Sequence, residues 1–455
     1  MTVLHESPTR LVAVMLLCFF VFSVLNMMRT YLGFGIMSAD FTIFEQVFYS
    51  IGKGNGFYST FEGGSHLGVH FSPVLLLFAP LVWLAKSLTV LIALHIGLTA
   101  IAMWWLFRYC QQEGDTGAGL VVVIMLMLHS TLTHNTRIFY ELALLPLPFV
   151  GVFINYEKQR FAHFFGWLLA LTCIRENLFV MIAAWGLLAF SFGRRGRWVW
   201  APLALAASHF VVANLVTPLL FPHSLNVSLL TCYQEYGNTA AEIYANLKAN
   251  PFLPFAFLFH KKNVVYLLGV LLPFLVLLPF CRRWWLPALP TLGFILFASG
   301  SRVILPTYHY SIEVVLWLGL STLMFLRDQS GFFASARIQR VLPKLCLLMI
   351  VAFVYRGGDA LLRLKTTLNS TREANFGIIQ AHIPPHASLL AEGRFCNRLA
   401  RRDHIYFLDL QNPVTAKVPA DFALLEGEPT YAIPETWRPH VTAGGFRLYR
   451  VLRDE

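Results

Sequence analysis

Apolar residues fill most of the chain in long runs that are separated by short polar segments. Several runs approach or exceed the roughly 20 residues that an α-helix needs to cross a bilayer. Strands of a transmembrane barrel would instead alternate apolar and polar positions over about ten residues. The pattern predicts an all-α polytopic membrane protein with about 11 crossings, at residues 11–28, 87–107, 119–133, 142–155, 162–175, 177–192, 198–218, 263–280, 285–300, 312–326 and 342–356.

Clusters of Arg and Lys flank the apolar runs and set the expected orientation, because such residues favour cytoplasmic loops. Placing the clusters around Arg108, Lys158 and Arg194 in the cytoplasm sends the loops 29–73 and 219–262 to the outer face. The apolar stretch 72–86 is short and contains prolines, so a re-entrant helix and a full crossing both remain open. The expected location is the cytoplasmic (inner) membrane.

The last hundred residues have a different pattern. The stretches IPPHASLLAEG, HIYFLDL and ADFALLE are bounded by Pro, Gly and Asp, which is typical of short strands, and GGFRLYRVLRDE could be a terminal strand. We therefore expect a transmembrane domain over residues 1–356 and a small C-terminal α/β domain on the extracytoplasmic side over residues 366–455.

Composition supports this interpretation and excludes some classes of function. The chain is 57% hydrophobic and 13% charged, whereas soluble proteins carry about 25% charged residues. The net charge of +11 arises mainly in the membrane part, so it does not indicate nucleic-acid binding. No phosphate loop, GxSxG turn or HExxH zinc motif occurs in the sequence.

The loop 29–73 contains an amphipathic segment, DFTIFEQVFYSI, whose apolar residues recur every three or four positions. This spacing predicts a helix that lies flat on the membrane surface. Asp40 would then be the N-cap or the first residue of the helix, and its carboxylate could also face a cleft as a general base or metal ligand. Glu45 is interpreted as a solvated or supporting residue.

His66 and His70 lie four residues apart in GGSHLGVHFSP, a spacing that could bind a metal on a helix. The neighbouring glycines argue against a helix here, so binding of an anionic or sugar group is at least as well supported. Glu62 is close in sequence and could balance a cation.

Ionisable residues at membrane depth are costly and usually face a cavity or a partner. Glu141, in FYELALL, and Arg175 with Glu176, in CIRENLF, are of this kind. They could orient short helices, or they could line an outward cleft together with Asp40. Arg302 and His309, in the next polar cluster, could join them, and a planar guanidinium such as that of Arg175 suits a phosphate.

The sequence of the first loop resembles that of a known family of prokaryotic predicted membrane proteins. This family is the domain of unknown function numbered twenty seventy-nine. The family shows D-x-x-x-F-x-Q, a Gly-rich turn and then L-G-x-H-F-x-P. One difference is that the family often has an Asp where this chain has Asn177, which removes one carboxylate. The family elements fall here on Asp40, Phe44, Gln46, Leu67, Gly68, His70, Phe71 and Pro73.

The family is in turn similar to integral-membrane glycosyltransferases of the GT-C class. That resemblance implies a GT-C-like fold, a polyprenyl-phosphate sugar donor, membrane lipids as further partners, and Asp40 as the catalytic carboxylate. No cofactor is required by the sequence, a divalent metal is left open, and the acceptor is not defined. The residues that would bind substrate are Gln46, Glu62, His66, His70, Glu141, Arg175, Glu176, Arg302 and His309.

Two other classes of function remain open from the sequence. A transporter or lipid flippase would use Glu141, Arg175 and Glu176 as a polar path, although no paired repeats with broken helices are apparent. A non-catalytic assembly or sensor protein would instead present its C-terminal domain.

Overall fold

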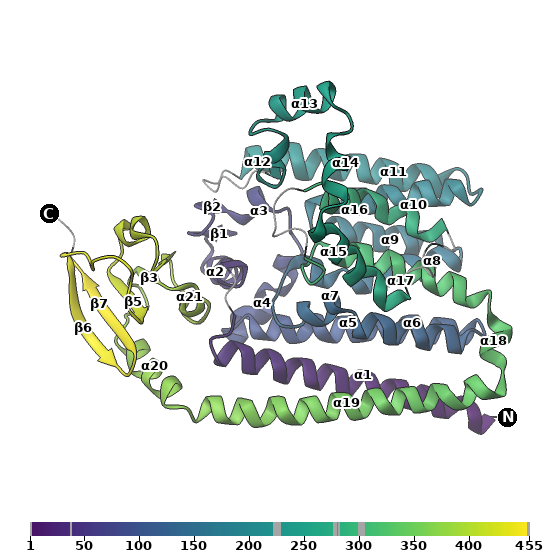
Figure 1. Ribbon diagram of the computed structural model, residues 1–455, viewed down its shortest axis with the longest axis horizontal. Coiled ribbons are helices and arrows are strands. Elements are labelled where there is room, and N and C mark those ends of the chain that lie inside the picture. Colours follow the sequence, from purple (N-terminus) through teal and green to yellow (C-terminus); the bar gives the residue numbers. More distant parts are fainter. Residues whose placement is uncertain are drawn as a thin grey trace.

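The computed structural model describes residues 2–36, 39–221, 229–275, 280, 283–298 and 305–452. Arg302 lies outside the described residues, as do parts of the predicted crossings 263–280 and 285–300. The described chain forms a helical body and a small C-terminal domain that contains a sheet (Figure 1).

Four stretches of helix are long and apolar enough to cross a membrane: Pro8–Leu32, Thr89–Gln112, Arg197–Leu220 and Arg337–Leu368. The third is made of two α-helices joined by a π-helical segment, Val211–Val216. Several other predicted crossings correspond to helices that are shorter than a bilayer is thick. A multi-pass membrane protein is therefore confirmed, and the count of eleven stays a prediction.

The helices of the body follow one another in chain order. Their bounds are α1 (Thr2–Leu32), α2 (Ala39–Lys53), α3 (His66–Val69), α4 (Leu75–Ala85), α5 (Thr89–Gln112), α6 (Thr116–Leu128), α7 (Ser130–Asn135), α8 (Pro146–Glu157), α9 (Phe161–Thr172), α10 (Phe179–Ser191), α11 (Arg197–Phe210), α12 (Thr217–Leu220), α13 (Ala240–Ala249), α14 (Leu253–Leu258), α15 (Lys261–Leu271), α16 (Leu289–Leu296), α17 (Ser311–Arg327), α18 (Ser330–Ala334) and α19 (Ala336–Leu368).

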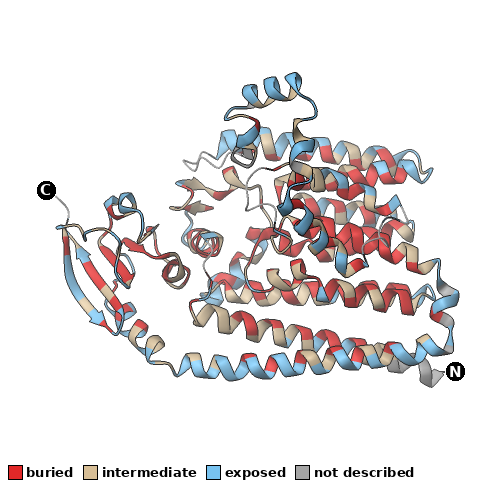
Figure 2. Ribbon diagram, in the orientation of Figure 1, coloured by how far each residue is buried: buried red, intermediate tan, exposed pale blue. Residues whose placement is uncertain are grey.

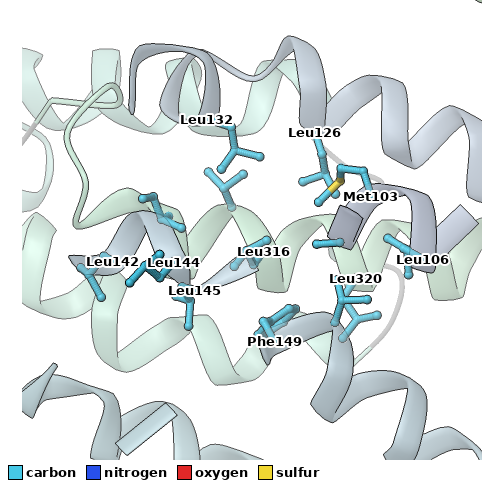
Figure 3. Packing of buried hydrophobic residues seen from close by; sticks show 14 of the residues in the cluster. Met103, Leu106, Leu126, Leu132, Leu142, Leu144, Leu145, Phe149, Leu316 and Leu320 are labelled. Atoms are coloured by element: carbon cyan, nitrogen blue, oxygen red, sulfur yellow. The ribbon is translucent and has the colours of Figure 1, made fainter. Parts of the chain in front are cut away.

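Buried side chains fill the centre of this body, whereas the outward faces of the peripheral helices are exposed (Figure 2). Leucine and methionine side chains from α5, α6 and α17 meet there (Figure 3). A Cβ atom at Gly319 would lie 2.9 Å from the Leu126 side chain, so glycine permits α17 to approach α6 closely. On α19, Leu347, Leu348, Val354 and Leu362 are exposed, as expected for a face that contacts lipid.

α1 and α19 run side by side along one edge of the body (Figure 1). α19 continues beyond residue 356, the predicted end of the last crossing, to Leu368. The predicted start of the C-terminal domain at residue 366 thus falls within the last turn of a continuous helix. This helix connects the membrane part directly to the C-terminal domain.

The C-terminal domain contains a five-stranded sheet in the order β4-β3-β5-β7-β6. β3 pairs in parallel with β4 and β5, and β7 pairs antiparallel with β5 and β6. The four stretches read as strands from the sequence are strands, while α20 and β6 were not predicted. The bounds are α20 (Thr371–Ala381), β3 (Leu389–Ala391), α21 (Gly393–Leu399), β4 (Ile405–Phe407), β5 (Phe422–Glu426), β6 (Trp437–Ala443) and β7 (Phe446–Val451).

The amphipathic segment of the first loop is a helix, α2, as predicted. Phe41, Phe44 and Phe48 are buried on its apolar side. Thr42, Glu45 and Gln46 on other sides are buried as well. The C-terminal domain, distant in sequence, covers the polar side of α2, and the position of this helix relative to the membrane surface stays a prediction.

Three side chains of α2 bind the C-terminal domain. Thr42 donates a hydrogen bond of 2.7 Å to the Asn397 side chain. The Gln46 amide donates to the carbonyls of Arg402 and Asp403, both at 3.2 Å. Glu45 pairs with Arg401 at 3.0 Å.

The Glu45 carboxylate also accepts a hydrogen bond of 2.5 Å from the Leu88 amide at the start of α5. Glu45 is only 3% exposed, so its interpretation as solvated was wrong and its supporting role is the correct alternative. Burial raises the pKa of the Glu45 carboxyl, and Arg401 opposes that effect.

Replacing Arg401 by Leu should destabilise the protein by about 1–3 kcal/mol, because it leaves a buried carboxylate without its cationic partner. The matched control is Arg438→Leu, at an exposed position on β6. Thermal unfolding of the two purified variants in detergent measures the difference. Equal stabilities would show that the Glu45–Arg401 pair does not hold α2 to the domain.

Candidate functional site

A short hairpin and the one-turn helix α3 place the first side chains of the site. β1 (Tyr58–Ser59) and β2 (Gly64–Ser65) pair antiparallel, and the turn between them carries Glu62. α3 follows at once, and its first residue is His66. Glu62 and His66 are 2% and 1% exposed, so both ionisable groups are buried.

His66 lies between two carboxylates. Its Nδ1 is 2.8 Å from Glu62 Oε1, and its Nε2 is 3.1 Å from Glu141 Oε1. Carboxylate oxygens accept hydrogen bonds, so both ring nitrogens donate and the ring is an imidazolium. Burial alone would lower the pKa of His66, but Glu62 and Glu141 outweigh it and raise the pKa to about 10.

Glu141 connects His66 to Arg175. It begins the 3₁₀ turn Glu141–Leu144 and is 1% exposed. Its carboxylate accepts a hydrogen bond of 3.0 Å from Ser72 and lies 3.8 Å from the Arg175 guanidinium. Burial would raise the pKa of Glu141, but Arg175 and His66 hold it well below its usual range.

Arg175 lies at the reversal between α9 and α10 and is 3% exposed. Its Nε is 3.6 Å from Glu176, and it donates a hydrogen bond of 3.1 Å to His70 Nε2. His70 Nδ1 is 2.9 Å from Glu176, and the guanidinium also faces the Tyr310 ring at 5.3 Å. The charge of Arg175 is therefore held in place by two carboxylates and an imidazole.

The two histidines are one turn apart on α3, so the argument from glycine against a helix was wrong. His70 is the C-cap, and its amide donates to the His66 carbonyl at 2.7 Å. Their rings lie 5.7 Å apart, but each ring binds its own carboxylates. Within the described part of the chain, no group of three His, Cys, Asp or Glu side chains is arranged to hold a metal ion.

Asp40 is the second residue of α2 and is partly exposed. Its charge acts on Arg175. Burial opposes the charge of that guanidinium, but Tyr310, Glu141, Glu176 and Asp40 together raise its pKa above the ordinary value. Asp40 therefore belongs to the same electrostatic group as the buried cluster.

His309 lies beside this cluster, in an aromatic stack with Tyr140 at 4.1 Å and Tyr310 at 4.2 Å. It is 4% exposed, and neither ring nitrogen has a hydrogen-bond partner among the described residues. Burial and the nearby Arg175 lower its pKa well below the ordinary value, so the ring is neutral.

A cavity of about 510 Å³ opens beside Arg175. Its polar end is formed by His70, Arg175, Glu176, Asn177 and Tyr310. The other walls are mainly apolar and come from α10, the π-helical segment with α12, and α16. These walls include Phe71, Phe179, Val180, Ala213, Pro218, Pro290 and Phe294.

The structure brings together most of the residues singled out in the sequence. Glu62, His66, His70, Glu141, Arg175 and Glu176 form one chain of contacts, with Asp40 and His309 next to it. Gln46 is not in this group, since its amide oxygen accepts from Ser59 and Thr60 and its nitrogen binds the C-terminal domain. Arg302 lies outside the described residues.

Two contributors had no clear signal in the sequence. Ser72 binds Glu141, and its place in the HFSP motif was the only indication. The His209 ring lies 3.1 Å from the Arg175 carbonyl and helps to fix the reversal. Asn177, where a carboxylate is missing relative to the family pattern, donates to Glu313 at 2.6 Å and therefore has a structural partner.

The stability of the protein should fall as the pH rises from about 6.5 toward about 10, because the charged His66 ring favours the folded state. The contribution is fully present below the unfolded pKa and is lost as the pH passes the raised folded pKa. His66→Gln should flatten this part of the curve, whereas His386→Gln, at an exposed position, should leave it unchanged. The measurement is the melting temperature as a function of pH; identical curves for wild type and His66→Gln would refute the charged state of His66.

The family described as Predicted membrane protein (DUF2079) matches residues 37–419, which is most of the chain and includes the whole cluster. No curated protein matches the sequence.

Proposed function

The chain belongs to the DUF2079 family of predicted membrane proteins, and from its site we propose that it is an integral-membrane glycosyltransferase. It takes a sugar from a polyprenyl-phosphate donor and passes it to an acceptor at the outer face of the cytoplasmic membrane. The observation that carries the proposal is a buried arginine at the polar end of a cavity whose other walls are mainly apolar.

The cavity suits a lipid that carries a phosphate. Apolar walls such as Phe71, Phe179 and Phe294 can accept an isoprenoid tail, and burial of that tail is favourable by about 25 cal/mol per Å². The neighbouring π-helical segment and α12 expose Val212, Leu215 and Leu219 to the surroundings. A tail can therefore enter from the bilayer without crossing a polar surface.

Arg175 suits the phosphate. Its planar guanidinium has five donors and binds oxyanions through parallel hydrogen bonds. Its contacts with Glu141 and Glu176, at 3.8 and 3.6 Å, are too long for hydrogen bonds, so donors remain for a ligand. The carboxylates keep the arginine charged and oriented before a ligand arrives.

Asp40 is the proposed general base. It takes the proton from the acceptor hydroxyl as that oxygen bonds to the anomeric carbon of the sugar. The bond from the anomeric carbon to the phosphate oxygen breaks, and the phosphate leaves with the electron pair. Arg175 stabilises the charge that develops on the leaving phosphate.

Asp40→Asn should lower sugar transfer by about 10²- to 10⁴-fold, the usual contribution of a general base. Asp40 lies in the first turn of α2, and asparagine there has nearly the same size and shape as aspartate, so the variant should fold. Transfer of labelled hexoses and pentoses from synthetic polyprenyl phosphates is measured in membrane vesicles that contain the protein. Glu428→Gln, at an exposed position in the C-terminal domain, is the control and should transfer normally.

Full transfer by Asp40→Asn would remove Asp40 from the mechanism. Lipid movement across proteoliposomes without any transfer by the wild-type protein would favour a flippase instead. In either case the variant Arg175→Lys tests the phosphate site, because lysine keeps the charge but lacks the planar guanidinium. Weaker binding of the polyprenyl phosphate by this variant is the expected result if the phosphate binds at Arg175.

A further inference from the structure

A second cavity, of about 550 Å³, lies where α1 and α19 reach the C-terminal domain. It shares no lining residue with the cavity at Arg175. Three arginines line it: Arg29 from the last turn of α1, Arg363 from α19 and Arg372 from the first turn of α20. We propose that this basic cavity binds a phosphate group at the membrane surface.

The hydrogen bonds around the cavity leave arginines as the donors for a ligand. The hydroxyls of Thr30, Thr366 and Thr367 each donate to a carbonyl of their own helix. The Ser370 hydroxyl donates to the Thr367 carbonyl at 2.6 Å. These side chains shape the cavity, but their protons are already used.

Arg29 has the most donor capacity left. It donates to the Asn26 side chain at 3.1 Å, and its buried Nε has no hydrogen-bond partner among the described residues. Arg363 pairs with Asp359, and Arg372 binds Glu426 through two hydrogen bonds. A buried donor without a partner costs free energy unless a ligand or water satisfies it.

More positive charge lies next to Arg29. Arg29 and Arg356 both act on Arg137, whose pKa is lowered by burial and by repulsion from these two arginines. Arg356 also lies over the Phe22 ring of α1 at 5.6 Å. No carboxylate pairs with Arg29, Arg137 or Arg356 within the described ranges.

Interaction with the helix ends explains only part of this arrangement. Arg29 and Arg363 lie near the C-terminal ends of α1 and α19, where cations are favourable. The favourable interaction with helix ends does not explain why Arg137 is repelled by both Arg29 and Arg356. A phosphate oxyanion would balance the repulsion and satisfy the buried Nε, and the start of α20 would favour it further.

The position at the end of a candidate membrane span suggests two sources for the phosphate: the headgroup of an anionic lipid, or a soluble phosphate. The test uses the full-length protein purified in a neutral detergent. One arm adds inorganic pyrophosphate, and the other adds micelles containing phosphatidylglycerol, with phosphatidylcholine as the reference. Binding is followed by the shift of the melting temperature as each ligand is titrated.

Arg29→Gln/Arg363→Gln should weaken the binding by at least about tenfold, because each lost arginine removes charge-assisted hydrogen bonds. The control, Arg195→Gln/Arg197→Gln, removes the same charge from exposed positions far from the cavity and should bind as the wild type does. A second pair covers poor folding of the first variant. Thr366 is exposed at the rim, so Thr366→Glu should abolish binding and Thr366→Gln should retain it.

The two arms separate the sources. A cavity-dependent shift with phosphatidylglycerol alone identifies a lipid headgroup, and a shift with pyrophosphate alone identifies a soluble phosphate. A shift with both shows that the phosphate group itself is recognised. No shift with either ligand, or equal weakening in the cavity variant and the control, would overturn the proposal.

Discussion

The buried charge of Arg175 is the constraint on which the rest of the site depends. A guanidinium that is 3% exposed is stable only if opposite charges and hydrogen bonds replace the water it has lost. Glu141, Glu176 and His70 provide that replacement from three different segments. The need to balance one charge therefore fixes the relative positions of α3, the turn at Glu141 and the start of α10.

His66 adds a second positive charge to the buried cluster. As an imidazolium between Glu62 and Glu141, it neutralises charge that Arg175 alone could not satisfy. Glu62 is carried by the hairpin turn, and the hairpin is fixed in turn by Gln46 of α2 through Ser59 and Thr60. The charge of Asp40 acts on the arginine, and Gln46 of the same helix binds the hairpin that carries Glu62, from which contacts run through His66 and Glu141 to Arg175.

The C-terminal domain takes part in this arrangement. Asn397 accepts from Thr42 and donates to the Ile36 carbonyl, and Arg401 balances Glu45. These contacts hold both the start and the middle of α2. The domain therefore acts as the outer wall that fixes the position of Asp40, and the contact between α2 and the domain is a structural part of the site.

The helical period of residues 40–51 and the strand patterns near the C-terminus were readable from sequence, because both depend on neighbouring residues. The enclosure of α2 was not readable, since Glu45 and Gln46 resemble a solvated face until partners some 350 residues away are known. Gly68 argued against a helix at His66, yet the ion pairs of that residue outweigh a propensity of about 1 kcal/mol. The number of crossings depends on whether the short helices span the membrane, and their apolar content alone does not decide this.

The most direct test of the central claim is a structure of the protein with a non-hydrolysable polyprenyl-phosphate sugar bound. We expect its phosphate within hydrogen-bond distance of the Arg175 guanidinium, its tail along Phe179 and Phe294, and its anomeric carbon facing Asp40. A phosphate bound elsewhere, with Arg175 still contacting only Glu141, Glu176 and His70, would contradict the account.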